Sequence, residues 1–96
     1  MPGRVLDRIR DAVRSQQYDV TKHAVDEMAE DGIDIIDIET AILNGRIAKT
    51  EKDDPRGTRY TIHGLAADGV TRVGSAGRFT DTGRYLIITA YEVTSE

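Results

Sequence analysis

The sequence predicts an α+β fold in which N-terminal helices pack on one face of a four-stranded antiparallel sheet. Apolar residues recur at helical spacing through the first half of the chain, up to residue 43. From residue 46 onward they tend to alternate, as in strands. Turn sequences at 54–57, 68–69 and 80–83 divide this half into four strands with short connections, which favours antiparallel neighbours. We expect one domain over residues 1–96.

The first helix is predicted over residues 4–17. Leu6, Ile9 and Val13 form an apolar row at helical spacing, so the helix is amphipathic and needs a surface to cover. Residues 16–19 are expected to connect this helix to the next.

The second helix has its own start and stop signals. Thr21 can cap it, and Val20 and Val25 occupy the positions of a hydrophobic staple around that cap. Met28 belongs to the apolar rows of the helix, and Gly32 ends it.

The third helix begins and ends on similar signals. Asp34 can cap its N-terminus, and Asn44-Gly45 predicts a left-handed exit at its C-terminus. Ile38 and Ile42 are expected to be buried. Because isoleucine is a poor helix former, packing rather than propensity must hold this helix.

The four strands differ in pattern. The first alternates weakly, which is typical of an edge strand, and the third contains a Gly-rich stretch at 74–77 that predicts a bulge. The last is the most apolar and is predicted to be central. The strands are expected at residues 46–52, 58–66, 70–79 and 84–93.

Alternation assigns Leu86, Ile88 and Ala90 of the last strand to the face under the helices. Thr89 and Tyr91 then lie on the opposite face. The predicted core joins this strand to the second and third helices through Leu86, Ile88, Met28, Ile38 and Ile42.

Composition limits the classes of function. The formal charge is −4, from 13 Lys and Arg against 17 Asp and Glu, which argues against a general polyanion-binding protein. The absence of cysteine excludes disulfides and thiolate metal sites. No apolar run is long enough to span a membrane, and the first residues lack the apolar core of a signal peptide. We therefore expect a soluble cytoplasmic protein that needs no metal or other cofactor.

Charge is unevenly distributed along the chain. Residues 26–39 contain seven acidic and no basic residues, whereas residues 56–84 contain five arginines and two acidic residues. Two interpretations are open: solvated faces that happen to differ in charge, or a functional basic patch in the strand region.

The candidate site is one face of the sheet. Arg59, Thr61 and His63 alternate onto this face, Arg72 and Arg78 can join them if the bulge keeps them in phase, and Thr89 and Tyr91 contribute from the last strand. Arginines, an imidazole and a phenol can together cleave an RNA phosphodiester, because the reaction needs a base, an acid and charge stabilisation at phosphorus. An ordinary solvated sheet face has the same composition and is the alternative.

His23 has two interpretations as well. It lies in the first turn of the second helix, where the helix dipole disfavours the imidazolium while Asp26 and Glu27 favour it. It is either a structural residue or an acid–base group where the helix meets the sheet.

The chain resembles a family of small bacterial and archaeal domains of unknown function, with an HA-x-x-RM-x-ER-G-I segment and an ITxY strand. The resemblance covers about residues 18–93. It implies a RelE/ParE/BrnT-like toxin fold, a role in a toxin–antitoxin system with an antitoxin partner, and cleavage of mRNA. The matching residues here are His23-Ala24, Met28, Gly32-Ile33, Asn44-Gly45 and Ile88-Thr89-Ala90-Tyr91.

The chain departs from this family where Glu27 and Asp31 replace arginines, and in its negative net charge. The sequence hypothesis is a metal-independent endoribonuclease. The alternative is a non-catalytic protein-binding or regulatory module derived from such a toxin. The catalytic candidates are His63, Arg59, Arg72, Arg78, Tyr91 and His23.

Overall fold

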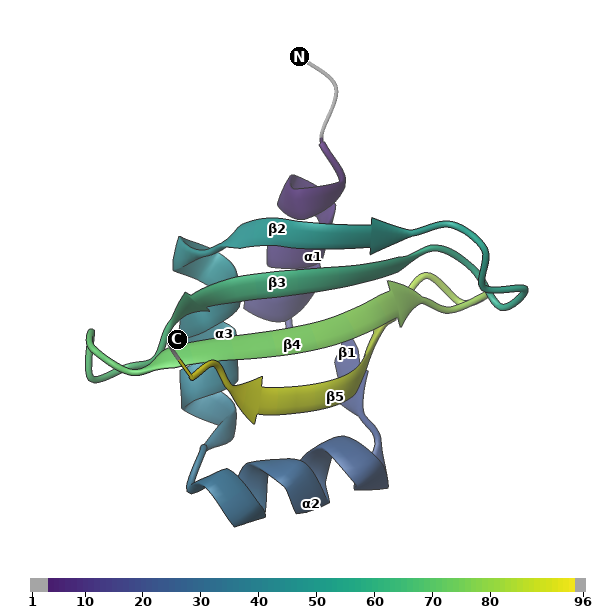
Figure 1. The fold of residues 1–96 in the computed structure, drawn as a ribbon. Coiled ribbons are helices and arrows are strands. Elements are labelled where there is room, and N and C mark those ends of the chain that lie inside the picture. Colours follow the sequence, from purple (N-terminus) through teal and green to yellow (C-terminus); the bar gives the residue numbers. More distant parts are fainter. Residues whose placement is uncertain (1–3, 95–96) are drawn as a thin grey trace.

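The computed structural model describes residues 4–94 and contains three helices and five strands (Figure 1). Helix α1 is shorter than predicted, because it begins at Val5 and ends at Arg14 rather than spanning residues 4–17. The elements are α1 (Val5–Arg14), β1 (Tyr18–Val20), α2 (Lys22–Asp31), α3 (Ile35–Asn44), β2 (Arg46–Glu51), β3 (Arg59–Leu65), β4 (Arg72–Phe79) and β5 (Tyr85–Glu92).

The sheet is mixed and five-stranded, in the order β1-β5-β4-β3-β2. The α+β class and the antiparallel run from β2 to β5 are as predicted, with β2 at an edge. The prediction of four strands is wrong, because β1 lies in the expected connector and pairs parallel with β5, Tyr18 opposite Tyr85. Three residues are too few to show alternation, and their partner is distant in sequence. The most apolar strand is also not central, since β4 occupies the middle.

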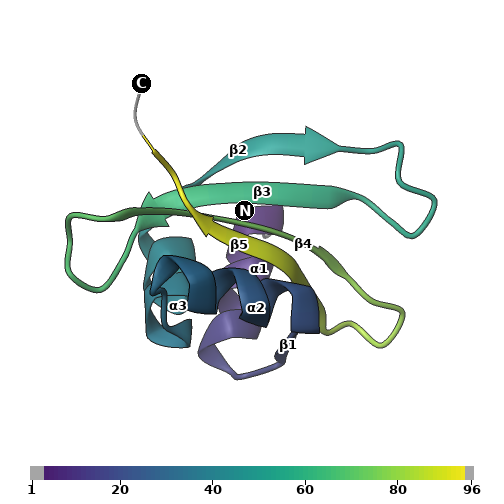
Figure 2. The ribbon, with the colours of Figure 1, turned by 60° about the horizontal axis from the view of Figure 1, so that its bottom comes forward.

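The helices all lie on one side of the sheet and leave the other side open (Figure 2). Helix α3 packs on β3 and β4, α1 packs against α3, and α2 runs along β5. One cluster of buried apolar residues joins these elements, with Ile9, Ile38, Ile42, Ile62, Ile87 and Tyr85 fully buried. No helix within residues 4–94 has the length and apolarity to cross a membrane.

The helix ends follow the predicted signals with two exceptions. The Thr21 hydroxyl accepts a hydrogen bond from the Ala24 N–H at 3.1 Å, and Gly32 is left-handed with φ 68°. Asp37 accepts from the Asp34 N–H at 3.0 Å, closing a capping box at α3. The first exception is Val25, which was to form the hydrophobic staple with Val20 but is half exposed.

Gly45 is the second exception, because its φ is −91° and the exit from α3 is not left-handed. Glycine is needed here for space. A Cβ at this position would lie 2.3 Å from the His63 carbonyl oxygen, where β3 crosses the end of α3.

The predicted burial of Leu86 and Ile88 is wrong. Tyr85 and Ile87 occupy the core instead, while Leu86 and Ile88 are partly buried. The reason is a bulge: Ala76 pairs with Thr89 and Gly77 with Ile87, so Ile88 is an extra residue on β5. The sequence predicts this bulge in the Gly-rich strand, β4, but the extra residue belongs to β5. Side chains of β5 before Ile88 therefore face the opposite side from the one that simple alternation predicts.

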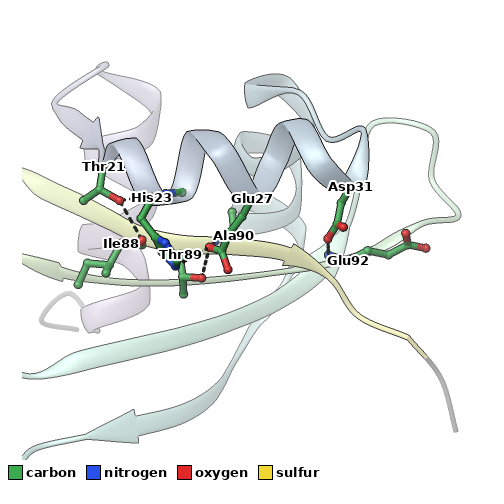
Figure 3. A network of polar contacts seen from close by, with 9 residues as sticks. Thr21, His23, Glu27, Asp31, Ile88, Thr89, Ala90 and Glu92 are labelled. Carbon is green, nitrogen blue, oxygen red and sulfur yellow. Dashed lines mark hydrogen bonds and ion pairs between the residues drawn. The ribbon is translucent and has the colours of Figure 1, made fainter.

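Helix α2 covers the part of the β5 edge that β1 leaves unpaired (Figure 3). The Thr21 hydroxyl donates to the Ile88 carbonyl at 2.9 Å. Carboxylates of Glu27 and Asp31 accept from the N–H groups of Ala90 and Glu92, at 3.1 and 3.0 Å. Glu27 and Asp31 are four residues apart on the helix, a rise of about 6 Å. Ala90 and Glu92 are two residues apart on the strand, a rise of about 6.6 Å, so the carboxylates and the N–H groups have matching spacings. The two acidic residues therefore replace a neighbouring strand.

Candidate functional site

The open face of the sheet is hollowed into a groove of about 580 Å³. Strands β2, β3, β4 and β5 all contribute to it. The lining residues are Ala48, Lys49, Glu51, Arg59, Thr61, His63, Ala76, Thr89 and Tyr91.

Strand register brings the groove side chains together. Thr61, Ala76 and Thr89 lie opposite one another on β3, β4 and β5, and His63, Gly74 and Tyr91 form the next such row. Residues directly opposite in an antiparallel pair share a face. The small residues of β4 therefore form the floor, and the polar side chains of β3 and β5 rise on either side of it.

His63 and Tyr91 are in direct contact across this floor. Their Nε2 and Oη atoms lie 3.4 Å apart, and the two rings meet edge to face at 89°. The Tyr91 ring lies over Gly74, where a Cβ would come within 2.6 Å of ring carbons. Gly74 thus lets the phenol fold down onto the sheet toward the imidazole.

Replacing Gly74 with Ala is expected to push the Tyr91 ring off the sheet and to cost about 1–3 kcal/mol of unfolding free energy. Urea unfolding measures this cost. Gly69→Ala is no control, because Gly69 needs its positive φ of 74°. Ala48→Ser is suitable, since Ala48 also lines the groove but is exposed on β2. A Gly74→Ala midpoint equal to that of the wild type would contradict the close approach.

The pKa of Tyr91 is raised by burial and by the nearby Glu27 carboxylate, against the opposing effect of Arg59. The phenol is therefore protonated at neutral pH. It can act as a proton donor in the groove, with a guanidinium close enough to stabilise the phenolate that would result.

Arg59 supplies a hydrogen-bond donor without a partner. Its Nε is buried, and no acceptor in the described part of the chain bonds to it. The Glu51 carboxylate lies 3.9 Å from this Nε and 3.6 Å from the Lys49 Nζ. One acidic residue thus faces two cations, so this end of the groove keeps an excess positive charge that an anionic oxygen can balance.

Glu27 connects the groove to α2. Its carboxylate accepts hydrogen bonds from the Thr89 hydroxyl and the Ala90 N–H, and lies 3.4 Å from the His23 Nε2 (Figure 3). His23 itself is exposed on the helix and lies outside the groove lining.

The structure gathers three of the predicted site residues, Arg59, His63 and Tyr91, in the groove. Arg72 lies opposite Leu65 at the end of β4 and is exposed. Arg78 lies opposite Leu86, beyond the bulge and outside the groove lining.

Sequence reasoning missed three groove-associated residues. Lys49 and Glu51 reach the groove because β2 has an irregularity between Ile47 and Lys49, which alters its alternation. Glu27 acts from a helix, and no local pattern relates it to β5. Within residues 4–94, no group of three or more His, Cys, Asp or Glu side chains could hold a metal ion.

Residues 20–92 match a protein family described as "Domain of unknown function (DUF4258)". No curated protein and no solved structure matches the chain significantly. The match begins at the end of β1 and ends with β5, so it includes every strand of the groove. Because it covers most of the sequence, the chain belongs to the DUF4258 family of domains of unknown function.

Proposed function

We propose that this domain is a toxin-like endoribonuclease of a toxin–antitoxin system, and that it cleaves single-stranded mRNA in the groove without a metal. The observation that supports this best is the contact between His63 and Tyr91 in a groove that Arg59 also lines. An imidazole, a protonated phenol and a guanidinium supply the base, the acid and the charge stabilisation that RNA transesterification requires.

In the proposed reaction, neutral His63 removes the proton of a ribose 2′-hydroxyl, and the 2′ oxygen attacks phosphorus. The bond to the 5′ oxygen breaks, and Tyr91 gives its proton to that leaving oxygen. Arg59 and Lys49 balance the charge on the phosphoryl oxygens. The proton on His63 then passes to the Tyr91 oxygen through their contact, which restores the site. The products carry a 2′,3′-cyclic phosphate and a 5′-hydroxyl.

The test is incubation of the purified protein with a single-stranded RNA of mixed sequence in the presence of EDTA. Products with 2′,3′-cyclic phosphate ends are expected, and mass spectrometry identifies them. RNA that stays intact at high protein concentration, without an antitoxin, would contradict the proposal. That result would support the alternative, a non-catalytic module that binds a protein partner. Two observations already favour this alternative: the negative net charge, and the absence of Arg72 and Arg78 from the groove lining.

Salt dependence distinguishes the arginines. Arg59→Ala is expected to reduce the slope of log affinity against log salt by about 0.7 for single-stranded RNA, because one phosphate contact is lost. Arg72→Ala should leave the slope unchanged, since Arg72 lies outside the groove. Fluorescence anisotropy between low and moderate salt measures both variants. Equal slopes for Arg59→Ala and the wild type would remove Arg59 from the binding site.

A further inference from the structure

The Thr89 hydroxyl is the starting point, because its proton is already engaged. Thr89 lines the groove, and its hydroxyl bonds to the Glu27 carboxylate. An ionised carboxylate only accepts hydrogen bonds, so the hydroxyl is the donor in this pair. A hydroxyl has one proton and two lone pairs, and Thr89 can therefore only accept a hydrogen bond from anything bound in the groove.

This acceptor is held firmly in place. Glu27 also accepts from the Ala90 N–H at 3.1 Å, and its helix is anchored to β5 through Thr21 at one end and Asp31 at the other. Thr89 itself belongs to β5, between β4 and the helix (Figure 3). The geometry of the hydroxyl is thus set by the sheet and by α2 together.

Besides Thr89, the groove presents two cations, Lys49 and Arg59, with the Glu51 carboxylate beside both of them. Lys49 and Arg59 carry N–H groups without any acceptor lone pair. A ligand that fits must place anionic oxygens near these cations and a hydrogen-bond donor near Thr89. In a ribonucleotide, the 3′-phosphate and the 2′-hydroxyl are attached to neighbouring carbon atoms of the sugar. Deoxyribose has the phosphate but lacks the 2′-hydroxyl donor.

We infer that Thr89, oriented by Glu27, accepts a hydrogen bond from a ribose 2′-hydroxyl and makes the groove select RNA over DNA. This inference rests on the proposed function, because it assumes that a nucleic acid lies in the groove. Thr89 is a specificity-determining residue in this scheme. The hydroxyl it recognises belongs to a nucleotide next to the one whose 2′ oxygen reacts.

The experiment compares binding of two labelled single strands of identical sequence, one of RNA and one of 2′-fluoro RNA. Fluorine removes the donor while keeping an RNA-like sugar, so the ratio of affinities isolates the hydrogen bond. Wild-type protein is expected to bind RNA about 3- to 10-fold more tightly. Every protein in these titrations, including the wild-type reference at Thr89, carries His63→Gln, because the active protein is expected to cleave RNA even in EDTA. Anisotropy gives both dissociation constants, and gels of the titrated samples confirm that the RNA is intact.

Thr89→Val should bring the ratio to about 1 while leaving affinity for 2′-fluoro RNA unchanged. Thr89→Ser keeps the hydroxyl and should restore the ratio. Thr61→Val is the matched control, because Thr61 lies in the same row of the groove on β3. It should preserve the wild-type ratio.

Several results would overturn the inference. A wild-type ratio of about 1 with salt-dependent binding would reject recognition of the 2′-hydroxyl by Thr89 while leaving the proposed function in place. A Thr89→Val protein that keeps the preference, or loses affinity equally for both strands, would do the same. Absence of binding to either strand would reject both the inference and the proposed function.

Discussion

His63→Gln is expected to lower the rate of RNA cleavage by about 10²- to 10⁴-fold, the usual contribution of a positioned acid or base. Glutamine has about the size of histidine and keeps a polar end near Tyr91, but it cannot take up a proton at neutral pH. His63 is the only imidazole lining the groove, and its Nε2 contacts the phenol that acts as the acid. Single-turnover cleavage assays measure the effect.

His23→Gln is the matched control for this variant. His23 is exposed on α2, with 68% of its side chain accessible, and the Glu27 carboxylate lies between it and Thr89. Its replacement is expected to leave the cleavage rate close to that of the wild type, because His23 lies outside the groove lining. Thermal melts of both variants establish that the fold is retained. Wild-type activity in His63→Gln would eliminate His63 as the base, and a loss confined to His23→Gln would move that role to the helix.

Ile87→Ala is expected to destabilise the domain by about 2–5 kcal/mol, a large part of the stability of a protein of this size. Ile87 is only 1% exposed and belongs to the core under the helices. Removing its side chain leaves a cavity that the surrounding helices can fill only in part. Chemical unfolding followed by circular dichroism measures the loss.

Ile88→Ala provides an internal comparison, because the two residues are adjacent and chemically identical. Ile88 is the extra residue of the bulge and is partly exposed, so its truncation is expected to cost about 1 kcal/mol. If side chains simply alternated along β5, Ile88 would be in the core, and Ile88→Ala would cost more unfolding free energy than Ile87→Ala. A larger loss for Ile88→Ala than for Ile87→Ala would show that the bulge is wrongly placed.

Much of the site could be predicted from the order of residues along single strands. Arg59, Thr61 and His63 share a face of β3 because alternate side chains always do so, and Thr89 and Tyr91 share a face of β5 for the same reason. The same alternation places Arg72 and Arg78 on this face of β4, but residues on one face need not line the same groove. Along β4 the two residues lie near opposite ends of the strand, on either side of the floor formed by Gly74 and Ala76.

Residue spacing and capping signals were enough to predict the α+β class, the three helices with their caps at Thr21 and Asp34, and the antiparallel order of the last four strands. These features depend on residues close together in the chain, where spacing and capping act directly. Folding in three dimensions set the pairing of β1 with β5, which are far apart in the sequence, and the bulge at Ile88, which depends on the register between β4 and β5. It also decided the environment of Thr89, because Glu27 reaches that hydroxyl only after α2 has packed along the edge of β5.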